Sequence, residues 1–194
     1  MMCLPSVLVS LLNGILSSIS QSAVAFFGVY YKLQTFIYMP TSGIVQGMRP
    51  LMSYNYGAKL KERMHQILKV SGLVIAAILG AGTLLFFIVP NVLLSLFNAS
   101  SGMLEIGETG LRILSLSFIV SSFGVLMSGV FEALGLGKYS LIVSLLRQLL
   151  ITVPLAYILL NVMGIEGIWL SFVIAEAIAS IVAYILYRKK FKTI

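Results

Sequence analysis

Long apolar runs, separated by short polar segments, cover almost the whole of the 194-residue sequence. A helix needs about 20 mostly apolar residues to cross a hydrocarbon core of roughly 30 Å. We therefore predict six transmembrane helices, over residues 3–20, 23–55, 68–97, 109–135, 140–162 and 168–187. Membrane β-strands would alternate in polarity, whereas runs such as "ILKVSGLVIAAILGAGTLLFFIVP" are continuously apolar. The pattern predicts an all-α, polytopic membrane protein.

The segments between these helices are not equally distinct. Four of them combine turn-forming residues with charge: "YGAKLKERMHQ", "NASSGMLEIGE", "GLGKYS" and "NVMGIEG". The first segment, "SSISQS", is polar but uncharged, so the division there rests on length. Pro40 and Pro50 lie inside the second predicted helix and predict a kink, because proline removes a backbone donor and clashes with the preceding turn.

Composition agrees with a membrane setting, since 59% of the residues are hydrophobic and 10% are charged. Cys3 is the single cysteine, His65 is the single histidine, and the sequence has no aspartate. Thiolate clusters, histidine-based metal sites and pairs of catalytic acids all need more such residues. We therefore expect no enzymatic activity, no metal and no cofactor.

The positive charges gather in alternate connections. They border the second and fourth connections and form the tail: Lys59, Lys61, Arg63, Lys69, Lys138, Arg188, Lys189, Lys190 and Lys192. Lys and Arg in short loops mark the cytoplasmic side, so both termini are predicted to be cytoplasmic. The net charge of +7 follows from this asymmetry, and no nucleic-acid partner is expected. Trp169, near the start of the sixth helix, is expected in an interfacial aromatic belt.

Of the charged residues inside the predicted helices, five are placed where a charge is costly: Lys32, Arg49, Glu132, Arg147 and Glu176. Such a group at the membrane centre costs at least about 2.5 kcal/mol, so each should be paired or hydrated. Counting along straight helices puts Arg49, Glu132 and Arg147 at one level, roughly 9 to 15 Å from the cytoplasmic face. We predict that these three form a structural charge network. Lys32 and Glu176 lie deeper and are predicted to form a second pair that could serve function.

Several segments carry a family resemblance. "MPTSGIVQGMRPLMSYNYGA", "PNVLLSLF", "EALGLGKYSLIVSLLRQLLITVPLAY" and "GIEGIWLSFVIAEAIASI" occur in this order along nearly the whole chain. Together they resemble the C-terminal six-helix lobe of a multidrug and toxic compound extrusion (MATE) transporter, most closely of the bacterial drug:cation antiporter branch. The resemblance implies an inner-membrane protein with two six-helix lobes around a central cavity that opens alternately to either side.

The implied activity is export of cationic amphipathic drugs coupled to inward Na⁺ or H⁺ flow. The N-terminal lobe is missing from this sequence, which is expected to be a fragment or the product of a truncated gene. Rocking of one repeat against another underlies alternating access, so a single lobe is expected to be inactive by itself. Membrane lipid and the missing lobe are its expected partners.

Four residues are candidates for the substrate or ion pathway: Gln34, Gln46, Glu132 and Glu176. Their carboxylates would attract a cation, and neighbouring Met and Phe side chains would supply adaptable apolar contacts. Some family members bind the coupling cation in this lobe with acids from its first and fourth helices. Here the first helix offers only Asn13 and Gln21, so a sodium site within the lobe is not expected.

Two alternatives remain open. A lipid-linked oligosaccharide flippase of related fold would use a cationic cavity, for which Lys32, Arg49 and Arg147 are available. A noncatalytic membrane remnant would need neither Glu132 nor Glu176 for transport.

Overall fold

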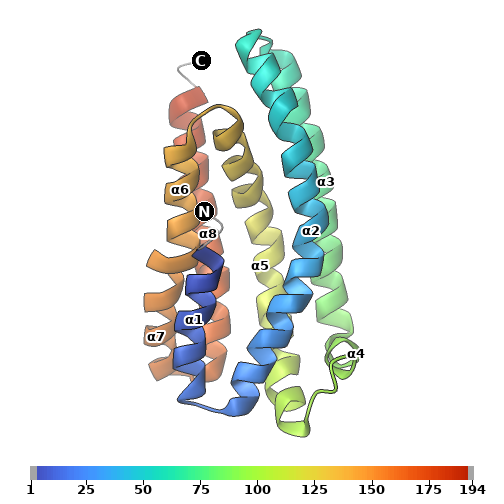
Figure 1. Ribbon diagram of the computed structural model, residues 1–194, viewed down its shortest axis with the longest axis vertical. Coiled ribbons are helices and arrows are strands. Elements are labelled where there is room, and N and C mark those ends of the chain that lie inside the picture. Colours follow the sequence, from blue (N-terminus) through green and yellow to red (C-terminus); the bar gives the residue numbers. More distant parts are fainter. Residues whose placement is uncertain (1–3, 192–194) are drawn as a thin grey trace.

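The computed structural model describes residues 4–191, and these residues form a bundle of helices (Figure 1). In chain order the elements are α1 (Leu4–Ser17), α2 (Gln21–Gly57), α3 (Lys61–Ile88), α4 (Pro90–Ser95), α5 (Ser101–Ala133), α6 (Gly137–Leu145), the π-helical turn η1 (Leu146–Leu150), α7 (Thr152–Met163) and α8 (Ile165–Phe191). The predicted all-α fold class is confirmed.

Within the described range, four helical segments are long and apolar enough to cross a membrane: Lys61–Ile88, Ser101–Ala133, Gly137–Met163 and Ile165–Lys189. The third of these joins α6, η1 and α7. Helix α1 is apolar but shorter, with 14 residues. Helix α2 has 37 residues and includes two charged residues, Lys32 and Arg49. The chain is a multi-pass membrane protein.

Helix boundaries differ from the predicted ones where polar residues continue a helix. The basic stretch after Gly57 was expected to be a connection, but α3 already begins at Lys61, so its first two turns contain exposed charged residues and His65. The third predicted helix also breaks at Pro90, which lacks an N–H donor and begins the separate helix α4. The division between the first two helices is as expected, since Ser20 caps α2 by accepting a hydrogen bond from the Ala23 N–H at 3.1 Å.

Helix α5 is the central element. It packs against α2, α3 and α8, and in Figure 1 it lies between α2 with α3 on one side and α6, α7 and α8 on the other. Small residues on α5 allow α2 to approach it closely. A Cβ added at Gly129 on α5 would lie 2.5 Å from Val45 Cγ1 on α2. Helix α2 itself is continuous through Pro40 and Pro50.

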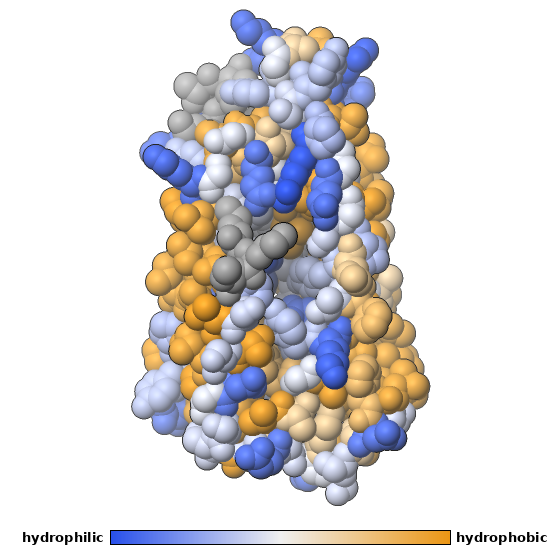
Figure 2. Space-filling view, viewed as in Figure 1, coloured by the Kyte–Doolittle hydropathy of each residue, from blue (hydrophilic) through white to orange (hydrophobic). Residues whose placement is uncertain are grey.

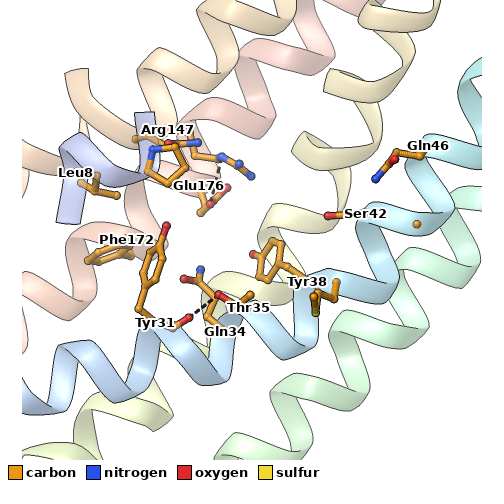
Figure 3. Close-up of a pocket in the computed structure, with 14 residues that line it drawn as sticks. Leu8, Tyr31, Gln34, Thr35, Tyr38, Ser42, Gln46, Arg147, Phe172 and Glu176 are labelled. Atoms are coloured by element: carbon orange, nitrogen blue, oxygen red, sulfur yellow. Dashed lines mark hydrogen bonds and ion pairs between the residues drawn. The ribbon is translucent and has the colours of Figure 1, made fainter. Parts of the chain in front are cut away.

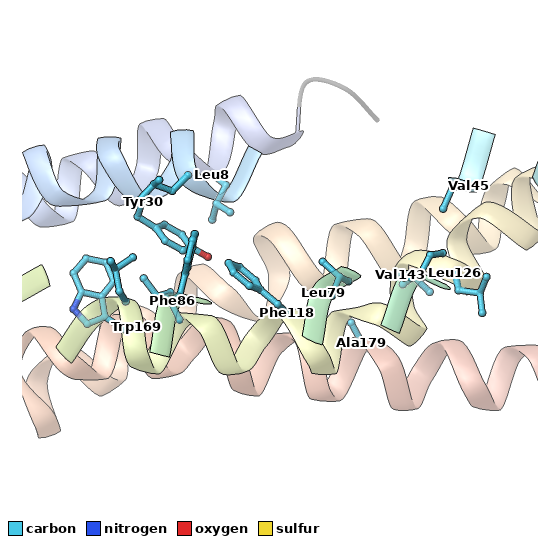
Figure 4. Packing of buried hydrophobic residues seen from close by; sticks show 14 of the residues in the cluster. Leu8, Tyr30, Val45, Leu79, Phe86, Phe118, Leu126, Val143, Trp169 and Ala179 are labelled. Atoms are coloured by element: carbon cyan, nitrogen blue, oxygen red, sulfur yellow. The ribbon is translucent and has the colours of Figure 1, made fainter. Parts of the chain in front are cut away.

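An aromatic cluster fills one end of the core. Trp169 is fully buried and makes an edge contact with Phe26, with ring centroids 5.0 Å apart, and a stacked contact with Phe27 at 6.2 Å. Figure 4 shows Trp169 beside Tyr30 in this cluster. The indole of Trp169 therefore packs between helices, and its expected place in an interfacial belt stays a prediction.

Candidate functional site

A pocket of about 550 Å³ lies among α1, α2, η1 and α8. Its described lining consists of Pro5, Leu8, Tyr31, Gln34, Thr35, Tyr38, Met39, Ser42, Gly43, Gln46, Arg147, Gln148, Phe172 and Glu176. Figure 3 shows Tyr31, Gln34 and Tyr38 from α2 and Phe172 and Glu176 from α8 around the space beside Arg147. Pockets of this size are typical of small-molecule sites.

Helix α2 supplies one wall because its polar residues repeat at helical spacing. Tyr31, Gln34, Tyr38, Ser42 and Gln46 recur every three or four residues and therefore share one face. Figure 2 shows a strip of hydrophilic residues between two apolar flanks. This is the face on which α1 and α2 lie in front in Figure 1. Apolar flanks suit contact with lipid, and a polar strip suits a cavity or an interface.

The turn η1 places a second group of polar side chains at the pocket. Pro154 has no N–H to donate to the carbonyl of Leu150, and its ring crowds that carbonyl, so a regular α-helix is disfavoured there. The chain instead makes a wider turn, in which the Ile151 N–H donates to the Leu146 carbonyl at 3.1 Å. The Thr152 hydroxyl donates to the Arg147 carbonyl. Such π turns often occur at functional sites.

Arg147 on η1 and Glu176 on α8 form an ion pair inside the pocket. The distance from Arg147 Nε to Glu176 Oε1 is 3.6 Å, and the two side chains are 21% and 13% exposed. Glu176 Oε2 is buried and accepts no hydrogen bond from the residues that the structure describes. Glu176 lies eleven residues into the 27-residue helix α8, or about 16 Å from its start, so the pair lies near the middle of the span.

Tyr38 is fixed in the pocket wall by a bond to the central helix. Its hydroxyl lies 2.6 Å from the Ser121 hydroxyl on α5, and its ring makes an edge contact with Phe118, with centroids 5.7 Å apart. This side chain is therefore held by two contacts on α5. The pocket wall is partly preorganised, which lowers the entropic cost of binding.

Three of the four predicted pathway residues line the pocket. Gln34 and Glu176 lie close to Arg147, whereas Gln46 is farther along α2 (Figure 3). Gln34 and Gln46 are twelve residues apart, which corresponds to about 18 Å along the helix. Glu132 is not among the described lining residues, so its role in a pathway stays a prediction without support from the pocket geometry.

The predicted partners of the charged residues are partly wrong. Arg49 pairs with Glu132 as expected, but Arg147 pairs with Glu176 and does not join them. The predicted pair of Lys32 with Glu176 is also wrong, and the Lys32 side chain is exposed. Counting residues along a helix gives the level of a side chain but not the side it faces. Arg147 also lies in a π turn, which a count along a straight helix does not include.

Among the lining residues that the sequence does not identify are Tyr31, Tyr38, Gln148 and Phe172. The spacing of tyrosine and amide side chains along α2 is a signal that could have revealed the first two. Gln148 directly follows Arg147, so it could have been found only with the π turn known. Phe172 lies in a continuously apolar stretch and gives no signal of its own.

The fold and the pocket define a helical membrane lobe with a polar site at mid-span. The profile of the MatE family matches residues 1–158, so the chain belongs to the MatE family. Multidrug export protein MepA of Staphylococcus saprophyticus is 26% identical over 190 residues, covering 94% of this chain and 42% of that protein. MepA of Staphylococcus aureus strain N315 is 26% identical over 175 residues, covering 90% of this chain and 38% of that protein.

Solved structures share the fold. An outward-facing multidrug resistance MATE family transporter of the MOP superfamily matches with a TM-score of 0.90 and 22% identity, covering 98% of this chain and 43% of that chain. A MOP superfamily transporter from Pyrococcus furiosus matches with a TM-score of 0.90 and 22% identity, covering 97% of this chain and 43% of that chain. The chain thus spans about two fifths of the length of these relatives.

Proposed function

We propose that this chain forms one lobe of a secondary active multidrug exporter in the inner (plasma) membrane. The exporter moves cationic amphipathic small molecules outward while Na⁺ or H⁺ flows inward. The observation that supports the proposal is the position of Glu176. Its carboxylate lines a pocket near mid-span, and the other walls of that pocket carry aromatic and amide side chains. Substrate sites of secondary transporters lie near the bilayer midplane at the interface between repeats.

The pocket chemistry fits an amphipathic cation. Glu176 supplies negative charge, and Tyr31, Tyr38 and Phe172 supply flat apolar surface and aromatic faces that attract cations. Gln34 adds an amide that can accept or donate hydrogen bonds. Met39 adds a flexible apolar side chain that adapts to differently shaped molecules.

The charges favour this substrate class over a pyrophosphate-linked lipid. A flippase site would present unpaired positive charge to the headgroup, yet Arg147 is paired with Glu176 and Arg49 with Glu132. Lys32 is exposed and is not among the described lining residues. None of the three cations available to a flippase therefore gives the pocket a net positive lining.

The exporter needs a second six-helix lobe, because alternating access comes from movement of one lobe against the other. The hydrophilic strip in Figure 2 is the face that we assign to that contact. Arg63 and Arg188 lie at helix ends that we assign to the cytoplasmic side, and we propose the same side for both termini.

Accumulation of ethidium, an aromatic cation, in a drug-sensitive host tests the proposal. Cells that make this lobe joined to a second lobe should accumulate less dye than cells with an empty vector. Cells that make only these 194 residues should accumulate as much as the empty-vector cells. Unchanged accumulation with both lobes present in the membrane would contradict export, and resistance from the 194 residues alone would contradict the need for two lobes.

A further inference from the structure

We propose that Arg147 is a tethered competitor of the transported cation. Its guanidinium occupies Glu176 when the pocket holds no substrate, and it is displaced only by cations that also bury aromatic or apolar surface. Arg147 would thereby determine specificity by excluding small inorganic and organic cations from a carboxylate at membrane depth. The inference rests on the proposed function and names the selectivity of the same pocket.

The geometry of the pair supports a displaceable contact. Arg147 Nε lies 3.6 Å from Glu176 Oε1, beyond ordinary hydrogen-bond distance, and the second carboxylate oxygen is buried without a hydrogen bond from any residue described. A charged group withdrawn from water is costly unless its hydrogen bonds are satisfied. Half of this carboxylate is unsatisfied and its other oxygen has only a long contact, so the carboxylate gains when a cation displaces Arg147 and binds it more closely.

The other ion pairs differ in this respect. Glu108 and Arg112 are 2.8 Å apart, one helical turn from each other on α5. Glu132 contacts Arg49 closely through Oε2, and its Oε1 accepts a hydrogen bond from Ser140 at 2.9 Å. Among the three ion pairs described between Leu4 and Phe191, Arg147 with Glu176 is the longest and also the least exposed. An ion pair that serves only to brace helices should be short and fully satisfied in such a place.

The surroundings of the pair explain why only some cations displace Arg147. A small cation offers Glu176 nothing beyond the charge that the guanidinium already supplies, and it loses hydration on entry. An amphipathic cation adds contact with Tyr31, Tyr38 and Phe172 around the same carboxylate. Cation–π and apolar contact with these rings favours the aromatic cation over the tethered one.

Binding of ethidium to the chain purified in detergent, followed by fluorescence, tests this inference separately from export. Arg147→Gln should tighten ethidium binding by about tenfold, because one charge-assisted contact no longer competes. The selectivity change is more diagnostic. Tetramethylammonium, which has a charge and little apolar surface, should compete with ethidium in Arg147→Gln and not in the unmodified chain.

Two further variants separate competition from a bracing role. In the double variant R147Q/E176Q the carboxylate is absent, so tetramethylammonium should again fail to compete. Arg112→Gln removes the same charge from an exposed pair outside the described pocket lining. It should leave the affinity for ethidium unchanged, and tetramethylammonium should still fail to compete. Arg147→Met, with an unbranched side chain, repeats the measurement if Arg147→Gln does not fold.

The proposal is overturned if a folded Arg147 variant binds ethidium no more tightly than the unmodified chain. It is equally overturned if tetramethylammonium competes with ethidium to the same extent in the Arg147 variant and in the unmodified chain. If neither Arg147 variant folds while R147Q/E176Q does, the pair is a brace and the proposal fails. Loss of ethidium export in cells with this binding pattern intact would count against the proposed function alone.

Discussion

Arg49 on α2 and Glu132 on α5 form an ion pair, and the same carboxylate accepts a hydrogen bond from Ser140 on α6. One acidic side chain therefore joins three helices near the ends where α5 and α6 meet. Arg49 is 41% exposed and Glu132 27% exposed, so solvent weakens the attraction between them. The arrangement holds α2 against the connection between α5 and α6.

A double-mutant cycle measures this contact. Arg49→Gln and Glu132→Gln should each lower the free energy of unfolding in detergent. The double variant should lose less unfolding free energy than the two single variants lose together. The coupling should be roughly 0.5 to 1 kcal/mol, the upper range for partly exposed pairs. The same cycle on the more exposed pair of Glu108 and Arg112 should give a smaller value. Equal coupling for both pairs would contradict a bracing role for Glu132.

Close packing of α5 on α2 depends on Gly129. A Cβ at this position would lie 2.5 Å from Val45 Cγ1, so Gly129→Ala forces the two helices apart. It should lower the free energy of unfolding by about 1 to 3 kcal/mol, the usual cost of overpacking. Gly80→Ala is the matched control, because nothing lies within 4 Å of its added Cβ. The control should be neutral or stabilising by up to about 1 kcal/mol, and equal loss in both variants would contradict the packing argument.

The π turn depends on Thr152, which is fully buried and donates a hydrogen bond to the Arg147 carbonyl. Thr152→Val keeps the shape but removes the donor, so thermal unfolding in detergent should show a loss of about 1 kcal/mol. Thr152→Ser keeps the hydroxyl and should retain more stability than Thr152→Val. A serine variant as unstable as the valine variant would show that the methyl group matters and the hydrogen bond does not.

The sequence predicts the membrane helices well because long apolar runs have few other folded states. Levels along straight helices also correctly bring Arg49 to Glu132. The same reasoning fails for Arg147, because residue counting does not give the neighbour that a side chain faces and does not reveal the π turn at Leu146–Leu150. Burial of Trp169 was missed for a related reason. A tryptophan near a helix end suits both an interface and a core, and only the position of Phe26 shows that the ring is buried.

The pocket could be predicted only in part. Gln34, Gln46 and Glu176 are unusual polar residues in apolar surroundings, so they are visible in the sequence. Phe172 resembles its apolar neighbours and becomes a lining residue only through the way α8 packs beside α2 and η1. The partner of Glu176 depends on contacts between helices distant in sequence, which helical periodicity does not determine.

Ethidium export by the complete two-lobe protein that carries Glu176→Gln is the decisive measurement of the role of this carboxylate. Ethidium efflux should be measured in cells with equal amounts of unmodified and variant protein in the membrane, with Glu108→Gln as the matched control outside the described pocket lining. Glu176→Gln should reduce efflux to the level of cells without the exporter, while Glu108→Gln should export normally. Efflux by a stable Glu176→Gln protein at the unmodified rate would contradict the assignment of this carboxylate to the substrate path.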